Sequence, residues 1–598
     1  MVSRLNSLWA AALILTCVSG TASALEVTVR APDTVADDLR IGSLAATLVD
    51  NAEGDEPIRP IDALGAAQAD YSRLIGVLYE LGYFAPTISI LVDGREAASI
   101  SPIAAPSAIS NIVIDVRPGD IFTFGTVSIT PQAPTSAPIE GLETGQTARV
   151  STLRAGTAAQ IAGWRQAGHA KADIESQQIT ARHAEKTVSA AITLDPGPQL
   201  RFGKLTITGE SKVREKRIRE IMGWPEGKVF DPDDIDKVQT RLRRTGAFAA
   251  ANLTEAETAN SDGTLDMTAT VSDQLQRRYS FGAEYSTIDG FGVNALWLHR
   301  NIFGGAERLQ IDGEIKGVGS NGGDGIDYRF GARLSRPATW RTDLEAYLLT
   351  ELAQRDDPSL FSRTFRLEFG ATYFASDTRE YSYGLGLRTS TTRDDLGERD
   401  YTILTGLFSA IFDKRDNPLD ATSGYYAKVG LTPFYGVSGT DSGLVSTLDL
   451  RTYRQIGSRV TLAFRGVVGS VAGPDLNRAP ADFLFFSGGS DTVRGQQFQS
   501  LGVDLSPGVT VGGRSYLGLS GEVRVKTGEN LSVVAFYDAG YVGPEAFFDG
   551  SGEWQTGYGA GVRYSTPIGP IRLDVAVPGS GPGDNSGFEL YIGIGQAF

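Results

Sequence analysis

Arg494 is the residue in this chain whose type and setting best suit specific polar chemistry. It lies within 493–495, inside a long connection between two alternating segments. Its guanidinium presents a planar fork of donors, which suits a carboxylate. Two later segments each turn an acidic side chain away from their apolar face: Glu522 in the first, and Asp538 beside Phe536 in the second. The simpler alternative is that Arg494 is an ordinary loop charge.

Sequence features that would indicate catalysis or cofactor binding are weak. The chain has no Gly-x-Ser-x-Gly, no His-Glu-x-x-His and no complete P-loop. The Gly-Lys pair at 227–228 has the wrong spacing and no following Ser or Thr, so it is interpreted as a turn. His169, His183 and His299 are scattered without metal-ligand spacing. We therefore expect no catalytic residue, no metal, no cofactor and no enzyme.

The segments that carry Glu522 and Asp538 alternate between apolar and polar side chains, and so does the end of the chain, residues 588–598. A strand with one apolar face and one face of small or polar side chains suits the wall of a barrel between lipid and a water-filled lumen. A half-buried strand of a soluble sheet would show the same pattern. The apolar face is predicted to hold Phe588, Leu590, Ile592, Ile594 and Phe598, and the other face Glu589, Tyr591, Gly593, Gly595 and Ala597.

Connection lengths favour the barrel over the soluble sheet. Counted back from the end, short connections at 566–570 and 526–530 alternate with long ones at 579–586, 542–553 and 474–514. Short periplasmic turns and long outer loops are typical of an outer-membrane barrel. The stretch from about residue 276 holds roughly 320 residues, enough for about 16 strands at about 20 residues per strand and connection. We therefore predict a 16-stranded antiparallel transmembrane β-barrel there.

An internal repeat precedes the predicted barrel. Residues 118–130 match 196–208, and residues 165–168 match 243–246 at the same offset. A third, earlier copy of the second motif is present at 80–84. Repetition at this length indicates tandem copies of one small domain. Each copy is predicted to contain a strand, two helices and two further strands.

The third copy shows this order most clearly. A strand is expected at 205–207 and a helix at 214–222. Asp231 with Pro232 predicts the start of a second helix, and Gly246 its end. The predicted boundaries along the chain are a signal peptide at 1–24, small domains at 25–118, 119–197 and 198–275, and a barrel at 276–598.

The start of the chain is predicted to be a signal peptide. Arg4 precedes an apolar run at 8–18 and an A-x-A site at 22–24. The only cysteine, Cys17, lies in this run, so the mature protein is expected to lack cysteine. No other segment has 18 consecutive apolar residues, so no transmembrane helix is expected. The net charge of −16 argues against nucleic acid as a partner.

The repeated domains, the barrel and the Val-Arg-Gly loop together resemble the superfamily of POTRA-bearing outer-membrane insertases and two-partner secretion transporters. This resemblance covers essentially the whole mature chain. It implies that the small domains are periplasmic POTRA domains and that the loop folds back into the lumen, where its arginine pairs with acidic and aromatic residues of the next two strands. The predicted loop lock comprises Val493, Arg494, Gly495, Glu522, Phe536 and Asp538.

The chain departs from the family pattern at one position of this loop. Gln496 stands where the family usually has an aromatic residue, and Phe498 follows two residues later. Only the packing partner of the loop is affected by this difference. Two further segments, 301–305 and 413–418 with Gly424, resemble turn motifs of the superfamily. Since Asn, Gly and Pro explain such turns by themselves, both are assigned a structural role.

The number of small domains narrows the resemblance. Three copies resemble the TamA branch, whereas BamA-type insertases usually have five and two-partner transporters two. This likeness implies an outer-membrane factor that assembles autotransporters and other β-barrels, with unfolded outer-membrane clients, outer-membrane lipids and a TamB-like, inner-membrane-anchored periplasmic partner. A BamA-like general insertase and a two-partner exporter are the alternatives.

The predicted mechanism places a lateral seam between the first and last barrel strands. The first strand is expected near 279–285, with Tyr279 and Phe281, and the last contains Gly593, Gly595 and Phe598. Glycines leave a strand little to pack, so they weaken it. Phe598 is expected at the periplasmic end.

Overall fold

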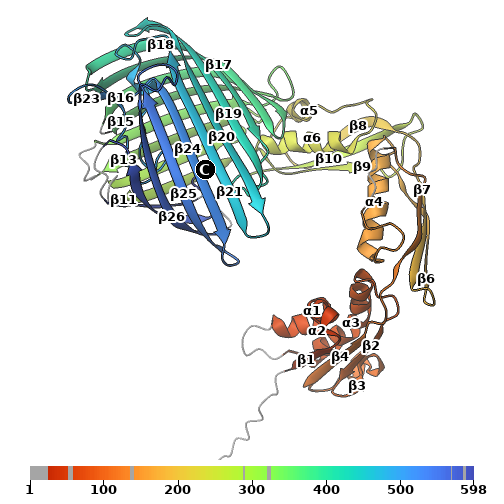
Figure 1. The fold of residues 1–598 in the computed structure, drawn as a ribbon. Coiled ribbons are helices and arrows are strands. Elements are labelled where there is room, and N and C mark those ends of the chain that lie inside the picture. Colours follow the sequence, from red (N-terminus) through yellow and green to blue (C-terminus); the bar gives the residue numbers. More distant parts are fainter. Residues whose placement is uncertain are drawn as a thin grey trace, which may run out of the picture. The chain divides into compact units, whose positions relative to one another are not determined.

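The computed structural model of the chain describes residues 25–51, 58–134, 140–286, 290–318, 325–357, 359–566, 569–582, 587–594 and 596–598. The predicted signal peptide, including Cys17, lies outside these residues, as does Gly595. The chain divides into two compact units. The first holds two small α/β domains, and the second holds most of a third together with a large sheet (Figure 1).

The first small domain contains a four-stranded sheet in the order β1-β4-β2-β3. Strands β1 and β4 are parallel, and β2 is antiparallel to β4. Its helical region is split at Ser43, whose side chain accepts a hydrogen bond from Ala46 N and so caps a new helix. The described residues of this domain therefore form three α-helices where two were expected. The elements are β1 (Glu26–Arg30), α1 (Asp33–Gly42), α2 (Leu44–Asp50), α3 (Pro60–Glu80), β2 (Thr87–Val92), β3 (Arg95–Glu96), the short 3₁₀ turns η1 (Ala97–Ser99) and η2 (Pro102–Ala104), and β4 (Asn111–Arg117).

The second small domain has a three-stranded sheet in the order β5-β7-β6. Its one helix among the described residues is α4 (Val150–Gln166), where two helices were expected. Pro131 and Pro134 oppose a regular helix directly after β5. The strands are β5 (Thr123–Thr130), β6 (Asp173–Arg182) and β7 (Thr187–Asp195).

The third small domain follows the predicted order of a strand, two helices and two strands. Its sheet has the order β8-β10-β9, the same arrangement as in the second domain. The side chain of Asp231 accepts a hydrogen bond from Asp233 N at 3.0 Å, which caps the second helix as expected. The elements are β8 (Arg201–Thr208), α5 (Glu215–Met222), α6 (Pro232–Arg244), β9 (Phe248–Glu255) and β10 (Thr264–Asp273).

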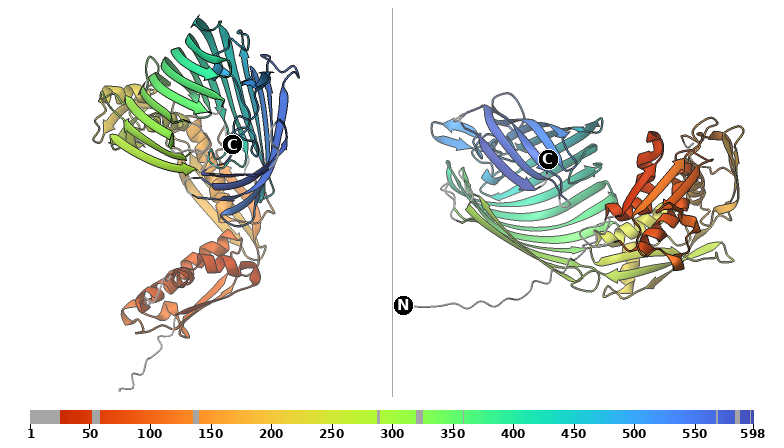
Figure 2. Two further views of the ribbon diagram at one scale, coloured as in Figure 1. Left: turned by 90° about the vertical axis from the view of Figure 1, so that its left-hand side faces the viewer. Right: turned by 90° about the horizontal axis from the view of Figure 1, so that it is seen from below.

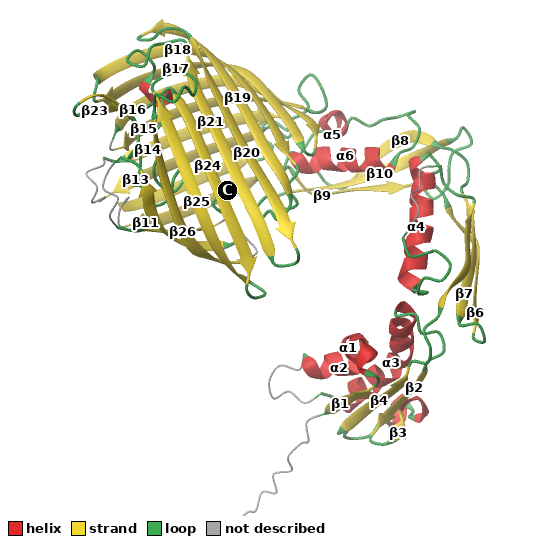
Figure 3. Ribbon diagram, viewed as in Figure 1, coloured by secondary structure: helices red, strands yellow, loops and turns green. Residues whose placement is uncertain are grey.

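The large sheet contains the 16 antiparallel strands that the sequence predicted. It curls into a barrel-like wall, while the α-helices belong to the small domains (Figures 2 and 3). Across the sheet the strands are β11 (Arg277–Ser286), β12 (Gly290–His299), β13 (Arg308–Val318), β14 (Asp327–Arg336), β15 (Leu344–Asp357), β16 (Leu360–Ser376), β17 (Arg379–Asp394), β18 (Gly397–Asp413), β19 (Gly424–Ser438), β20 (Gly443–Ile456), β21 (Val460–Ala472), β24 (Ser515–Lys526), β25 (Leu531–Gly543), β26 (Glu553–Tyr564), β27 (Ile571–Ser580) and β28 (Glu589–Ile594).

Alternation along these strands gives the sheet two unlike faces. The outer face exposes apolar side chains, such as Val533 at 43% and Tyr537 at 54%. The inner face carries Glu522 and Asp538, which are both buried. Register between β24 and β25 runs without a shift, so the two strands keep the same faces throughout. The structure therefore places these residues on the faces that the sequence predicted.

A long segment between β21 and β24 enters the interior of the sheet. It contains the 3₁₀ turn η3 (Ala481–Phe483) and the hairpin strands β22 (Val503–Ser506) and β23 (Val509–Val511). Isolated antiparallel bridges join Phe485 to Gly513 and Ser487 to Leu501, so the two ends of this segment lie side by side. In the part of the chain that the structure describes, no helix is both long and apolar enough to cross a membrane.

Candidate functional site

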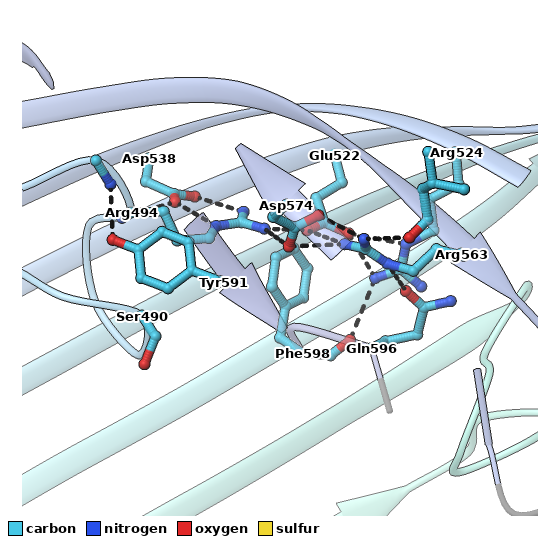
Figure 4. A network of polar contacts seen from close by, with 12 residues as sticks. Ser490, Arg494, Glu522, Arg524, Asp538, Arg563, Asp574, Tyr591, Gln596 and Phe598 are labelled. Atoms are coloured by element: carbon cyan, nitrogen blue, oxygen red, sulfur yellow. Dashed lines mark hydrogen bonds and ion pairs between the residues drawn. The ribbon is translucent and has the colours of Figure 1, made fainter. Parts of the chain in front are cut away.

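The candidate site is centred on the Arg494 guanidinium, which lies on the inner face of the sheet (Figure 4). Its Nε donates to Asp538 Oδ2 at 2.7 Å and its Nη2 to Asp538 Oδ1 at 3.0 Å. Its Nη1 donates to Glu522 Oε1 at 2.8 Å. The fork thus binds one carboxylate with two parallel bonds and a second with its remaining edge. Only 3% of the Arg494 side chain is exposed.

Packing and backbone shape hold the arginine in this position. The guanidinium carbon lies 3.6 Å from the ring centroid of Phe536, within cation–π distance. Val493 is fully buried, and its side chain lies over Gly540. Gly495 has φ +92°, and a Cβ there would lie 2.5 Å from Val577 O, so only glycine fits without a shift. The structure therefore brings all six residues of the predicted loop lock together.

Further charged groups extend this site along the inner face. Arg494 Nη1 also lies 3.5 Å from Asp574 Oδ2 on β27. Arg563 on β26 donates to the same oxygen at 3.1 Å, and Arg524 Nε on β24 donates to Glu522 Oε2 at 2.8 Å. Three carboxylates and three guanidinium groups therefore balance in a nearly dry cluster. Such balance offsets the desolvation of each buried charge.

The last strand and the residues after it join the same network. Tyr591 Oη on β28 accepts a hydrogen bond from Gly495 N at 3.1 Å. Gln596 accepts from Arg563 Nε at 3.1 Å and donates to Asp420 at 2.8 Å. Apart from the bond to Asp420, Figure 4 shows these contacts as one line of polar groups that runs from the loop to residues 596–598.

Phe598 corrects one prediction from the sequence. Alternation assigned it to the outer, apolar face, but its side chain is only 8% exposed and packs with Tyr453 and Ala463 inside the sheet. Its carbonyl oxygen accepts from Arg524 Nη2 at 3.3 Å. The reason is that β28 ends at Ile594, so the two-residue period no longer applies beyond it.

Gln496 replaces the expected aromatic residue with hydrogen bonds. Its Nε2 donates to Thr556 O at 2.8 Å and to Ser580 O at 3.2 Å. It thereby ties the loop to the backbone of β26 and β27. Phe498 does not compensate for the missing ring, because its side chain is 56% exposed.

The predicted seam residues lie on two strands at opposite ends of the sheet order. Tyr279 and Phe281 on β11 are 60% and 80% exposed on the outer face. Gly593 pairs with Arg572 of β27. Among the described residues, β11 pairs only with β12 and β28 only with β27. The structure therefore does not bring the seam residues of the two strands together by pairing.

A second arginine cluster, here called the arginine clamp, joins the third small domain to turns of the large sheet. Arg241 Nη2 lies 2.7 Å and Arg244 Nη2 3.0 Å from the Asp343 carboxylate. Arg217 Nη2 donates to Pro337 O at 2.5 Å, and Arg214 Nη1 to Phe303 O at 2.9 Å. The clamp consists of Arg214, Arg217, Arg241, Arg244 and Asp343. Sequence reasoning did not identify it, because its contacts join segments about 100 residues apart.

Two turn segments show how carboxylates stabilise the ends of strands. Burial of Asp343 would raise its pKa, but hydrogen bonds from Arg241 and Arg244 outweigh burial and hold that pKa below its usual value. Burial acts the same way on Asp416, yet hydrogen bonds from Thr422 and Ser423 lower its pKa to about 2. Asp416 belongs to the 413–418 motif. The structure shows this motif as a hydrogen-bonded turn, in agreement with the structural role assigned to it from the sequence.

The remaining inner face is also polar. A cavity of about 370 Å³ lies between β13–β17 and η3. It is lined by Glu314, Lys316, Asp327, Tyr328, Arg329, Glu351, Ala353, Gln354, Arg355, Ser362, Thr364, Arg366, Arg388 and Asp482. Within the described residues, no group of three or more His, Cys, Asp or Glu side chains could hold a metal ion.

Sequence reasoning missed Arg563, Asp574, Tyr591 and Gln596 as members of the site. Alternation could have identified three of them, because Arg563, Asp574 and Tyr591 fall on the inner positions of alternating strands. Gln596 follows the end of β28, so alternation could not have placed it.

Comparisons with known proteins agree with this fold. Residues 301–598 match the Omp85 superfamily domain, and residues 200–273 match the POTRA family, described as a surface antigen variable number repeat. The outer membrane protein assembly factor BamA of Nitratidesulfovibrio vulgaris is 24% identical over 434 residues, covering 69% of this chain and 52% of that protein. BamA of Neisseria meningitidis serogroup B is 22% identical over 468 residues, covering 69% of this chain and 58% of that protein.

The chain spans about half the length of these curated relatives. Among solved structures, BamA from Haemophilus ducreyi lacking POTRA domains 1–3 has a TM-score of 0.58 at 15% identity. The match covers 79% of this chain and 98% of that one, and it concerns the fold alone. The two matches thus identify an Omp85 superfamily domain over residues 301–598 and a POTRA domain over residues 200–273.

Proposed function

We propose that this protein is a bacterial outer-membrane assembly factor that helps to insert or translocate other outer-membrane proteins. The observation that carries the proposal is the pair of sheet edges, since β11 and β28 each have one strand partner among the described residues. The Omp85 and POTRA domain matches and the name shared by the BamA relatives support it. The small domains would then be periplasmic POTRA domains.

The two faces of the large sheet support a position in the membrane. Large apolar side chains are exposed on the outer face of many strands, including Phe330 at 51%, Phe369 at 54% and Leu385 at 72%. Charged side chains line the inner face and its cavity. An apolar outside with a polar inside is the pattern of a transmembrane β-barrel.

The unpaired edges suggest how a client strand is received. An edge strand presents free backbone N–H and C=O groups, which an incoming strand can satisfy by β-augmentation. Strand β6 offers a similar edge in the second small domain, where almost every residue is exposed. Because the periplasm holds no ATP, the free energy comes from the folding of the client itself.

The loop lock supports this mechanism by stiffening one side of the seam. Through Arg494, Gly495 and Gln496 the loop contacts β24, β25, β26, β27 and β28. These five strands are thereby held to one another independently of any β11–β28 pairing. The wall can therefore keep its shape when the seam between its edges opens.

A reversible cross-link of the seam tests this proposal. With Cys17→Ser as background, the variant Phe281→Cys/Leu590→Cys joins the outer faces of β11 and β28 through a cleavable bifunctional reagent. In proteoliposomes, folding of a urea-unfolded small outer-membrane barrel is followed by its heat-modifiable gel mobility. We expect the cross-link to abolish assistance and its cleavage to restore it, while each single-cysteine variant keeps wild-type activity. Full assistance by the cross-linked protein would refute the seam mechanism.

A narrower proposal is that the protein is the TamA-like subunit of a translocation and assembly module. The three small α/β sheets support it, and a TamB-like periplasmic protein with an inner-membrane anchor would be the partner. Affinity capture of the three small domains from periplasm and inner membrane should then retain a large β-rich protein. Capture of lipoprotein accessory subunits instead would favour the BamA-like alternative.

The segments that fill the inside of the large sheet favour an assembly factor over a steadily open exporter. The loop lock and Phe598 occupy the inside of the wall next to β24–β28. A two-partner exporter would need a persistent passage, so planar-bilayer recordings separate the two. We expect small, intermittent conductance, and a large, steady conductance would support the exporter.

A further inference from the structure

One connection of the large sheet folds back onto the outside of the wall. It comprises residues 544–552 between β25 and β26 and is called the outer flap. Register pairs Tyr541 with Leu517 on one side and with Trp554 on the other, without a shift. Tyr541 therefore points to the same outer face as Val533 and Tyr537, yet it is fully buried whereas they are about half exposed.

The flap itself covers Tyr541. The ring of Phe548 lies 4.7 Å from that of Tyr541, centroid to centroid, and the ring of Trp554 lies 5.4 Å from it. Tyr541 Oη accepts a hydrogen bond from Gly552 N at 2.9 Å, so its polar end is also satisfied by the flap. The three rings form a compact aromatic cluster on the outer face.

Hydrogen bonds extend the flap sideways across the wall. Ser470 Oγ on β21 donates to Ala546 O at 2.6 Å. Ser470 pairs with Ser515 of β24, and both are on the outer face. At the root of the flap, Arg514 Nε donates to Pro544 O at 2.7 Å and Nη2 to Glu545 at 2.7 Å. The flap thus lies across the ends of β21, β24 and β25 as a fixed structure.

Two phenylalanines are exposed on the flap, together with the acidic side chains of Glu545 and Asp549. Phe547 is 71% and Phe548 58% exposed, and Trp554 beside them is 40% exposed. Two exposed phenylalanines on a fixed loop present a surface that water solvates poorly. This surface continues the exposed aromatic face of Tyr537 and Tyr558 below it on β25 and β26.

We infer that the outer flap is a lipid-binding surface embedded in the outer leaflet of the membrane. The inference rests on the proposed membrane position of the sheet. The flap lies on the outer face of the wall, which is the face that alternation assigns to lipid. It also joins β25 to β26 at the end of the strands that is opposite to the end joined to the third small domain. Phe547 enters the acyl-chain region, while the acidic Glu545 and Asp549 remain at the headgroup level. A loop, and not only strands, therefore sets the depth of β24–β26 in the membrane.

Spin-label accessibility tests the inference. In the Cys17→Ser background, single cysteines replace Phe547, Tyr558 on the wall, and Leu505 on the β22–β23 hairpin, and each carries a nitroxide. The protein is reconstituted in vesicles of dioleoylphosphatidylcholine, and heat-modifiable mobility verifies the fold. We expect the Phe547 label, like the Tyr558 label, to collide freely with oxygen and several-fold less with a water-soluble nickel chelate than the Leu505 label.

Each contrary outcome has a distinct meaning. If the Phe547 label matches Leu505 while Tyr558 remains in lipid, the flap faces water and the inference is wrong. If both Phe547 and Tyr558 are open to nickel, the membrane position itself fails. If the Phe547 label is shielded from both reagents and shows spin–spin broadening, a second copy of the chain covers the flap and lipid does not.

Discussion

The loop lock and the arginine clamp use the same chemical group in two different environments. In both, an arginine fork binds a carboxylate with bonds of about 2.7–3.0 Å. In the loop lock Arg494 and Asp538 are 3% and 2% exposed, whereas in the clamp Arg241 and Asp343 are 19% and 26% exposed. Similar geometry therefore does not mean similar energy, because water can replace a lost partner only in the clamp.

This difference also indicates which contact can change during function. Breaking the loop lock leaves buried charges unpaired, so the loop is expected to remain seated through a working cycle. Breaking the clamp costs much less, so the third small domain can shift against the turns of the sheet. The variants below test this contrast in order of expected effect.

The largest effect is expected for Asp538→Ala. It leaves the Arg494 guanidinium in a dry site with half of its fork unpaired, which costs about 3–5 kcal/mol. The urea midpoint of unfolding in micelles, read by heat-modifiable mobility, measures it. Asp441→Ala is the matched control, because its pair with Arg478 is more than half exposed; we expect its midpoint to stay within error. Equal midpoints for both variants would contradict the proposed difference between buried and exposed pairs.

Arg494→Lys should have a smaller effect than Asp538→Ala. The charge remains, but an ammonium cannot bind Asp538 with two parallel bonds and reach Glu522 as well. We expect a loss of about 1–3 kcal/mol and faster cleavage of the 473–514 segment by external protease. A lysine variant with wild-type stability would mean that charge alone, and not the fork, holds the loop.

Asp343→Asn tests the clamp. Two arginines lose an ionic partner that is partly exposed, so we expect a cost of about 1 kcal/mol. Hydrogen exchange in α6 should accelerate while the strands β24–β27 stay protected. Acceleration in those strands as well would show that clamp and wall unfold as one unit.

The pH dependence of the clamp should be the smallest effect near neutrality. The folded pKa of Asp343 lies below its unfolded value of about 3.9. Its contribution is therefore fully present above that value and is lost as pH falls through the folded pKa. We expect α6 protection to be constant from pH 7 to about pH 5 and to fall only below the unfolded pKa of an aspartate. Asp343→Asn should remove this step, and a step that persists in the variant would assign it to another group.

Alternation explains why so much of the wall could be predicted from sequence. Because the side-chain period of a strand is two, Glu522, Phe536 and Asp538 had only one face available once their apolar neighbours were assigned. The count of 16 strands followed from the length of the region, at about 20 residues per strand and connection. The two-residue period predicts the face of a side chain only within a regular strand.

Features beyond regular strands could not be predicted on the same basis. Phe598 lies inside because β28 ends at Ile594, and nothing in the alternation marks that end. The clamp joins Arg241 to Asp343 through the packing of two domains, which has no local period. Gln496 shows a third case, where backbone hydrogen bonds replace an aromatic contact that the family pattern led us to expect.

The two edge strands of the large sheet differ in length among the described residues. Strand β11 has ten residues, whereas β28 has six. Each residue pair of an antiparallel ladder adds to the number of hydrogen bonds. Under the proposed function, a client strand would therefore be held along more of β11 than of β28. Such a strand should detach from β28 first and from β11 last. The lengths of the two edges would thus give client release a fixed direction.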